Sequence, residues 1–461
     1  MHRRSDAHDN EVSRLPADES VALSCVWVTE AYLPSHVPKL LRGLERLGWL
    51  RPNDIFGNNG LDEWLSQARH RPSGGATINL GAVHREDETA TVGHIFRSDL
   101  RAPFPGGIKY AEVQLVQPVP SLTVLVIQFM LGQEAAAGLE PPLRADYRTD
   151  LDASSNGGWV VHDSPDIRRQ EALVVRLGLR DACAQFVADF LPGFFAEEQD
   201  LRVFPTADLL TVAQHPLASD AENPLSRPSF IDVLDLRPHF DAYISTKLPG
   251  LFILPERGRY DVGRHLTFTG TQRELLASED FKSVDGLAVR LRFESDVLVL
   301  WTIRTMVYDL GADLAKLRDV VGNLAGSDDA PAIQAIREVE RELATIAGDF
   351  MPLLADLEDD FVVAVLAKDA RGFTAYDKRY ADGDFGEHTA DRLKQCARQA
   401  SRAYADVRLA AQSLGTLAAA QASEDATSAS LALQRITLWL AVVSTVVALL
   451  ALGQAVMQWR R

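Results

Sequence analysis

The sequence predicts an α+β protein: an N-terminal mixed α/β region with a mostly antiparallel sheet, then long helices ending in a single C-terminal transmembrane helix. Three observations predict this class. Short runs rich in Val and aromatic residues alternate with helical patterns through residues 21–285. From residue 286 onward, apolar residues recur at helical spacing over long stretches. Residues 436–459 carry no charged side chain, and a predominantly apolar stretch of that length is typical of a membrane span.

The chain of 461 residues is too long for one ordinary domain. The changes in composition predict four parts. These are a disordered, polar N-terminus (1–20), an α+β region with a possible internal boundary near 136–158 (21–285), a long-helix and coiled-coil stalk (286–434), and a transmembrane anchor (435–461).

Composition also limits the partners. The net charge of −17 would repel phosphate backbones, and no dense Lys/Arg cluster offsets it, so we do not expect nucleic acid as a partner. Cys25, Cys183 and Cys396 are far apart and odd in number, which indicates neither a disulfide framework nor a zinc site. The N-terminus lacks the apolar stretch of a signal peptide, so we expect the bulk of the chain on the cytoplasmic side.

The first part of the α+β region predicts a sheet with helices. A Val- and aromatic-rich strand at 21–33 precedes an amphipathic helix at 37–49 and a short helix near 61–69. Two pairs of β-like runs follow, each expected to form a hairpin: 76–84 with 89–97, and 108–117 with 121–131.

The middle of the chain begins with a loop or linker that ends in Ser154-Ser155-Asn156-Gly157-Gly158, then a short strand at 159–162. Asp163 or Ser164 can cap a helix that opens with Pro165 and runs to Phe190. The apolar positions expected on this helix are Ile167, Leu173, Val174, Leu177, Phe186, Val187 and Phe190. Residues 194–285 contain short, proline-punctuated runs that we assign to a mixed α/β region.

Alternation in residues 287–293 predicts one more strand, after which the pattern becomes helical. The first long helix starts at Ser295. A second starts after Pro331 and is expected to continue to Leu366, with a kink at Pro352. The apolar stripe of the first helix is Val297, Leu300, Trp301, Val307, Leu310, Leu314, Leu317 and Val321.

The last helix is expected to begin near Thr389 with a heptad register. Its predicted seam is Leu393, Cys396, Ala400, Ala403, Val407, Ala410, Leu414 and Leu417. The heptad pattern then fails, and the polar residues 423–430 favour a hinge before the membrane segment over a single continuous rod.

The apolar segment Ile436–Trp459 gives roughly 36 Å of helix at about 1.5 Å per residue, enough to cross a bilayer core of roughly 30 Å. Trp439 and Trp459 lie near its ends, where indole rings prefer the headgroups. The expected partner is therefore the lipid bilayer. The residues that represent this anchor are Ile436, Trp439, Leu440, Val443, Val447, Leu450 and Trp459.

One face of the same segment carries small residues at alternating spacings of three and four: Ala441, Ser444, Ala448, Ala451 and Ala455. Small residues let membrane helices approach closely, so this face favours a homo-oligomer through the C-terminal helix. An ordinary single anchor is the alternative.

A long helix that runs into the apolar segment at residues 435–453 resembles the stalk and first membrane helix of CorA-type magnesium transporters. The resemblance covers residues 295–453 at most. The family's Gly-Met-Asn signature and second span are absent from this sequence, so the resemblance implies no transport and assigns no residue.

No phosphate-binding glycine loop, nucleophile elbow or zinc motif occurs in the sequence, so no catalytic, cofactor or metal residue is assigned. His84 and His94 beside an acidic turn, and the acidic run Glu358-Asp359-Asp360, are expected to be solvated surface. The leading hypothesis is a membrane-anchored binding, sensing or scaffolding module. The alternatives are an enzyme of unrecognised class in residues 21–285 and a degenerate CorA-type relative.

Overall fold

The computed structural model describes residues 2–50, 60–70, 75–87, 100–153, 159–198, 200–217, 229–236, 238, 241–257, 262–277, 283–291, 294–325, 333–377 and 383–459. Tertiary contacts divide the chain into two compact units. The first, which we call the head, comprises Met1–Leu310 and Asp349–Gln399. The second, the helical unit, comprises Gly311–Gly348 and Ala400–Arg461.

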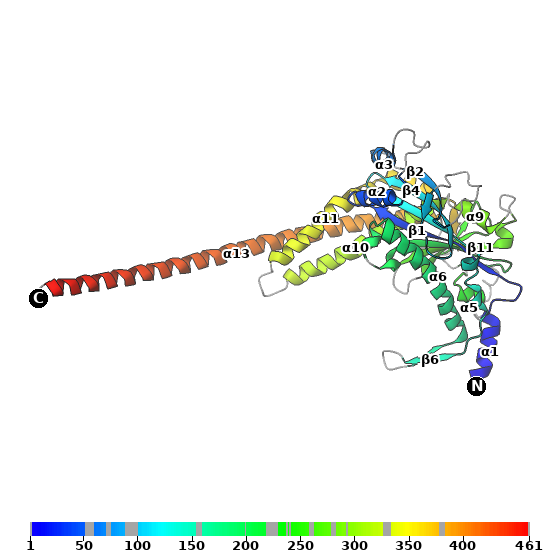
Figure 1. Ribbon diagram of the computed structural model, residues 1–461, viewed down its shortest axis with the longest axis horizontal. Helices are drawn as coiled ribbons and strands as arrows, with labels where there is room; N and C mark the ends of the chain where they lie inside the picture. The colour runs from blue at the N-terminus through cyan, green and yellow to red at the C-terminus, as the bar shows by residue number, and fades with distance from the viewer. Residues whose placement is uncertain are drawn as a thin grey trace. The chain divides into compact units, whose positions relative to one another are not determined.

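The head is built on a ten-stranded mixed sheet whose order is β12-β9-β10-β11-β8-β1-β5-β4-β2-β3. Figure 1 shows these strands as arrows beside the helices of the head. The strands are β1 (Val21–Tyr32), β2 (Ala76–Arg85), β3 (Leu100–Ala102), β4 (Ile108–Val119), β5 (Leu122–Leu131), β8 (Thr206–Val212), β9 (Tyr243–Ser245), β10 (Phe252–Arg257), β11 (Val262–Thr271) and β12 (Phe373–Ala375).

The sheet is antiparallel except for two neighbouring pairs, β8 with β11 and β2 with β3, which are parallel. The expected hairpin of β4 and β5 is present. The expected partner of β2, residues 89–97, lies outside the described residues. Within the described chain, β2 pairs with β4 and β3. Every residue of β5 is buried, as its nearly unbroken apolar sequence predicts for a strand covered on both faces.

Helices cover both faces of the central strands. Helix α6 (Ser164–Phe190) packs against β1 on one face, with Asp163 capping it by accepting a hydrogen bond from Asp166 N at 3.0 Å, as predicted. On the other face lie α9 (Val284–Leu291) and α10 (Ser295–Ala325), where Thr29 Oγ1 lies 2.6 Å from Thr302 Oγ1.

The strand expected at 287–293 is wrong, because residues up to Leu291 form α9. Leu287, Ala288 and Leu291 are its buried residues, which is one helical face, and Gln128 of β5 donates a hydrogen bond to the Ala288 carbonyl at 2.7 Å. Over so short a run, alternation and helical periodicity select overlapping apolar positions.

The N-terminus expected to be disordered forms a helix, α1 (His2–Ser13). Asn10 is buried, donates to the Tyr147 carbonyl at 2.6 Å and accepts from Tyr147 N at 2.9 Å. Polar side chains, rather than an apolar stripe, therefore attach this helix to the head, and hydropathy patterning does not detect such an attachment.

The remaining elements of the head are short. The segment expected as a linker contains α4 (Gln133–Ala136), α5 (Glu140–Arg144) and β6 (Asp150–Ala153). The strand predicted at 159–162 is present as β7 (Trp159–His162), which pairs with β6. The others are α2 (Val37–Arg46), α3 (Leu61–Arg69), the 3₁₀ turns η1 (Phe195–Glu198) and η2 (Leu201–Val203), α7 (Phe230–Val233), α8 (Gln272–Leu275) and α12 (Asp360–Asp369).

The apolar stripe predicted for the first long helix is confirmed, because all of its positions in α10 are buried. The second long helix, α11 (Ile333–Glu358), continues through Pro352 but ends before the predicted limit. Asp359 starts a new helix, α12, by accepting a hydrogen bond from Phe361 N at 2.8 Å. Phe361, which lies beyond this break, is 62% exposed.

Helix α13 (Phe385–Trp459) supplies the last helix. From Ala390 onward, its buried positions are Ala390, Leu393, Ala397, Ala400, Tyr404, Val407, Ala411, Leu414 and Ala418. The predicted seam is therefore right at every second position and displaced by one residue at the others. Leu417, for example, is 52% exposed, whereas Ala418 is buried.

The hinge expected at residues 423–430 is not present, since α13 is helical without interruption from Phe385 to Trp459. Ser and Thr side chains in this stretch bond back to the helix itself, as Thr427 Oγ1 does to the Ser423 carbonyl at 2.8 Å. Such bonds accommodate short polar residues within a helix.

Candidate functional site

The buried carboxylate of Asp208 is the centre of a cluster of buried polar and charged side chains in the head. Asp208 lies on β8 between the apolar residues Ala207 and Leu209, and is 0% exposed. In the sheet it lies opposite Val26 of β1 on one side and Thr267 of β11 on the other. A lone acid within a buried strand requires partners that compensate its lost hydration.

Helix α6 supplies the principal partner, Arg176. Its Nε and Nη2 atoms donate to the two carboxylate oxygens of Asp208 at 3.1 Å each, which is a bidentate pairing. Nη2 also donates to Thr267 Oγ1 at 2.8 Å, and Nη1 to the Leu234 carbonyl at 3.4 Å. Arg176 therefore connects α6, β8, β11 and the turn after α7.

Arg180, one helical turn further on α6, is much less satisfied. It is 5% exposed and donates one hydrogen bond to Asp208, from Nη2 to Oδ2 at 3.2 Å. Its Nη1 lies 3.8 Å from Glu256 Oε1, and its Nε is buried with no hydrogen-bond partner among the described residues. A guanidinium has five N–H donors, so Arg180 retains unused donor capacity.

His265 of β11 completes the cluster. Its Nδ1 lies 2.8 Å from Thr206 Oγ1, and its Nε2 lies 3.2 Å from Asp208 Oδ1 without a well-aligned hydrogen bond. Burial, together with the charge of Arg180, lowers the pKa of His265 to about 4. Burial alone would raise the pKa of Asp208, but Arg176 and Arg180 hold it well below its usual range. At neutral pH the cluster thus contains two cations, one anion and a neutral imidazole.

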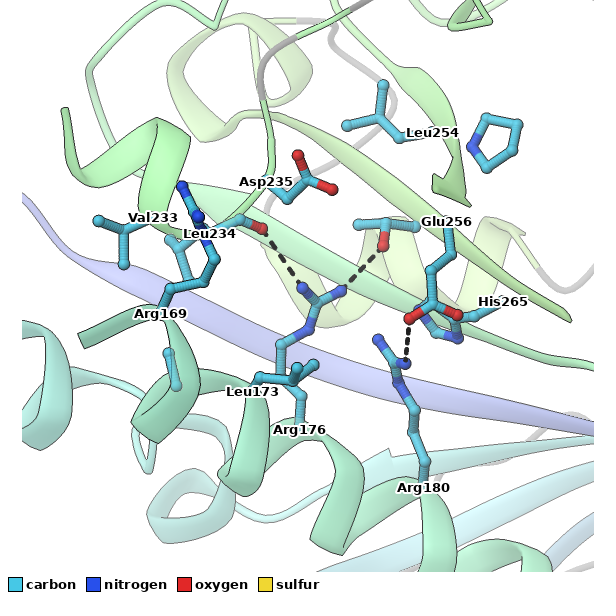
Figure 2. Close-up of a pocket in the computed structure, with 13 residues that line it drawn as sticks. Arg169, Leu173, Arg176, Arg180, Val233, Leu234, Asp235, Leu254, Glu256 and His265 are labelled. Atoms are coloured by element: carbon cyan, nitrogen blue, oxygen red, sulfur yellow. Dashed lines mark hydrogen bonds and ion pairs between the residues drawn. The ribbon is translucent and has the colours of Figure 1, made fainter. Parts of the chain in front are cut away.

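A cavity of about 400 Å³ opens beside this cluster, and we call it the arginine pocket. Figure 2 shows Arg176 reaching from α6 toward Leu234, and Arg180 extending toward Glu256. The pocket is lined by α6, the turn after α7, β10 and β11. Its apolar lining comes from Ala172, Leu173, Val233, Leu254 and Pro255.

Acidic residues line another part of the pocket. Asp235 is exposed and adopts a left-handed backbone conformation, with φ of 56°. Asp and Asn tolerate this conformation better than most residues. Glu256, whose side chain is 43% exposed, lies near Arg180. The pocket therefore presents arginine donors together with carboxylate acceptors.

This arrangement favours binding over covalent chemistry. Both nitrogens of His265 face protein groups, and the hydroxyl of Thr267 already accepts a hydrogen bond from Arg176. Within the described residues, no group of three or more His, Cys, Asp and Glu side chains is arranged to hold a metal ion. The lining offers charge, hydrogen bonds and apolar surface, which are the ordinary components of a small-molecule site.

The sequence did not reveal this pocket. Leu173 and Val174, expected on the apolar face of α6, are 38% and 63% exposed. Two signals point to it in retrospect. One is the single acid, Asp208, next to the apolar residues Leu209 and Leu210, and the other is the spacing of four residues between Arg176 and Arg180 on α6.

The predicted anchor residues lie on α13. Ile436, Trp439, Leu440 and Val443 are between 53% and 69% exposed. Ala441 and Ser444 of the small-residue face are exposed as well. The backbone of the others is helical, and their side chains lie outside the described part: Val447, Ala448, Leu450, Ala451, Ala455 and Trp459. By length and composition, α13 is the one helix in the described chain that can cross a membrane.

The other candidates from the sequence form no site. His84 is buried rather than solvated and lies against the Tyr110 ring, with centroids 5.9 Å apart, while His94 lies outside the described residues. Asp163 and Asp359 cap helices.

Comparisons with protein-family models, with curated proteins and with solved structures found no match to this chain.

Proposed function

We propose that this chain is a membrane-anchored binding protein whose head binds a small ligand with an anionic group in the arginine pocket. The main support for this proposal comes from Arg180. Its guanidinium is buried, donates one hydrogen bond to Asp208 and lines a cavity that a ligand can enter. Leaving donors of a buried arginine unused is unfavourable. An anionic ligand group would use those donors.

The cavity size supports a small molecule. About 400 Å³ lies in the lower part of the range of roughly 300 to 1,000 Å³ typical of small-molecule sites. The acidic residues Asp235 and Glu256 restrict the ligand further, because a second anionic group near them would be repelled. The favoured class is therefore a compact zwitterion, with a carboxylate or phosphate for Arg180 and a cationic group or hydrogen-bond donor for the acids.

The anchor is the second part of the proposal. The exposed, apolar side chains of α13 from Leu431 to Val446 have no protein cover within the described chain, and a bilayer core would bury them. The free cysteines Cys25, Cys183 and Cys396 fit a head in a reducing compartment. Self-association through the small-residue face starting at Ala441 belongs to the same proposal.

Thermal unfolding of the detergent-solubilised full chain tests the ligand. The probes are zwitterionic α-amino acids, sugar phosphates and dicarboxylic acids, with affinities then measured by calorimetry. We expect the zwitterions to stabilise the head most. Loss of one charge-assisted hydrogen bond, worth about 1.5 to 3 kcal/mol, should make Arg180→Gln bind at least about tenfold more weakly.

Arg42→Gln is the control, because Arg42 is exposed on α2 and does not line the pocket. Its affinity should equal that of the wild type. Arg180→Lys keeps the positive charge at this position. The thermal unfolding of each variant shows whether that variant is still folded. Equal affinity of the wild type and Arg180→Gln for the best ligand would refute the site, as would the absence of stabilisation by every probe.

A further inference from the structure

A second basic cavity lies in the head, where α10, α13 and β11 meet. Its volume is about 330 Å³, and it shares no lining residue with the arginine pocket. Three arginines line it, Arg264, Arg304 and Arg392, together with Tyr308, Gln395 and Cys396. None of its described lining residues is acidic, although the chain as a whole carries a net charge of −17.

Arg304 is held in place by an aromatic ring. Its guanidinium carbon lies over the Trp301 ring, 4.4 Å from the centroid. The indole is itself fixed, because Trp301 is 3% exposed and its Nε1 donates to the Arg264 carbonyl at 3.2 Å. Within the described chain, the structure gives the Arg304 guanidinium this aromatic contact but neither a hydrogen bond nor an ion pair.

The charges in this cavity repel each other. Burial and the neighbouring charge of Arg392 lower the pKa of Arg304 to about 10, so the guanidinium remains charged at neutral pH. Arg392 likewise has no ion pair among the described residues. Arg264 is the exception, since it donates to Asp309 Oδ1 at 2.6 Å and to the Val203 carbonyl at 3.0 Å.

Arg304 and Arg392 face one cavity without an ion pair among the described residues, and two such cations match a dianion. We infer that this cavity binds a phosphate group, with Arg304 and Arg392 donating to its oxygens and Gln395 and Tyr308 at its rim. A guanidinium presents paired N–H groups that fit two phosphate oxygens, and a monophosphate carries nearly two negative charges at neutral pH. The inference does not depend on the ligand proposed for the arginine pocket.

The position of the cavity gives the phosphate a structural consequence. Arg304 lies on α10 and Arg392 on α13, so one bound phosphate would link these two helices within the head. Both helices continue from the head into the helical unit, and α13 also contains the candidate membrane span. The site is thus placed to report a phosphate-bearing ligand to two of the helices that continue into the helical unit.

Cys396 provides a direct readout. It lines the cavity and is partly exposed, whereas Cys25 and Cys183 are 0% exposed, so a thiol reagent applied to the folded protein should label Cys396 first. We expect inorganic pyrophosphate to slow the alkylation of Cys396 by iodoacetamide in the full-length protein. Sulfate-free chloride buffer of equal ionic strength is the reference, which separates binding from screening.

Two variants test the donors, and a third is the control. Arg304→Gln and Arg392→Gln should each reduce the affinity for pyrophosphate, read from the protection of Cys396, by about tenfold or more, since each loses a charge-assisted interaction. Arg398→Gln, an exposed position on α13 outside the cavity, should protect as the wild type does. Thermal unfolding confirms that each variant is folded, and Arg392→Gln, at an exposed position, remains informative if Arg304→Gln is unstable.

A second experiment distinguishes a soluble phosphate ligand from a lipid headgroup. In it, the protein is reconstituted in phosphatidylcholine vesicles with or without phosphatidic acid. Protection by pyrophosphate assigns a soluble ligand, and protection by phosphatidic acid alone assigns a lipid headgroup. Unchanged Cys396 labelling with both probes overturns the inference, as does protection that survives in Arg392→Gln. Failure of the Arg180 experiment leaves this outcome unaffected, because the two cavities have different lining residues.

Discussion

Arginine and alanine, rather than leucine, form much of the buried face of α6. Arg168, Ala172, Arg176, Arg180 and Ala184 recur every four residues and are all buried. Each arginine stem packs while its guanidinium reaches a specific partner, which for Arg168 includes Asn10 Oδ1 at 2.8 Å. Hydropathy patterns place such residues on the solvent side, so the buried face of this helix could not be predicted from apolar spacing.

Asp208→Asn should destabilise the head severely. The substitution leaves Arg176 and Arg180 buried without their shared anion, and breaking a buried ion pair in this way costs about 3 to 5 kcal/mol. The measurement is the free energy of unfolding in urea. Asp235→Asn, at an exposed acid of the same pocket, should change it by less than about 0.5 kcal/mol. Similar small effects for both variants would contradict the assigned role of Asp208.

His265 should make the head sensitive to acid. Its pKa is about 4 in the folded protein and about 6.5 in an unfolded chain, so the unfolded state binds the proton more readily. The stabilisation is therefore complete above pH 6.5 and is lost as the pH falls through 4, by about 3 kcal/mol in total.

Urea unfolding at pH 7 and at pH 4.5 measures this loss. In His265→Gln, which cannot be protonated, the decrease in unfolding free energy between the two pH values should be smaller than in the wild type. An equal decrease in both proteins would show that His265 is not the acid-sensitive group.

The heptad pattern of α13 predicts half of its buried positions correctly and does not determine the others. Leu393, Ala400, Val407 and Leu414 are buried as predicted. Between them the chain offers small residues on adjacent rows, such as Ala410 and Ala411, and composition does not distinguish the two rows. Tertiary packing selects the row that contains Tyr404, the largest side chain available.

A matched pair of substitutions tests this register. Ala411→Lys places a charge at a buried position and should destabilise the protein by about 3 kcal/mol or more. Ala410→Lys, at the neighbouring exposed position, should change stability by less than about 0.5 kcal/mol. Far-UV circular dichroism during urea unfolding gives both values. The opposite order would restore the register predicted from the sequence.

Other elements were predictable because a strong local signal agreed with the tertiary structure. The stripe of α10 from Val297 to Val321 is uniformly apolar, and Asp163-Ser164-Pro165 combines two candidate cap residues with a proline suited to the first turn of a helix. The sheet order was not predictable, since β8 and β11 pair in parallel across about 50 residues of intervening chain, and the short, proline-interrupted strands between them carry weak periodicity.

At the scale of the whole chain, one sequence joins a head with two basic cavities to a helix that can cross a membrane. The apolar segment was the clearest prediction, because its length and lack of charge are properties of the sequence alone. The cavities were not predictable, since their arginines come from helices and strands that meet only in the tertiary structure.

Helix α13 is the proposed membrane anchor of this protein. Flotation of the full-length protein with lipid vesicles, after a wash at high pH, tests it directly. We compare the wild type with Val447→Arg/Leu450→Arg, in the centre of residues 436–459, and with Leu431→Arg/Leu433→Arg, just before them.

An arginine at the centre of a span costs about 2.5 to 3.5 kcal/mol on the insertion scale. The wild type and the Leu431→Arg/Leu433→Arg control should therefore float with the vesicles, and the central double variant should remain largely at the bottom of the gradient. Recovery of the wild type in the soluble fraction, or equal flotation of all three proteins, would contradict the proposed anchor.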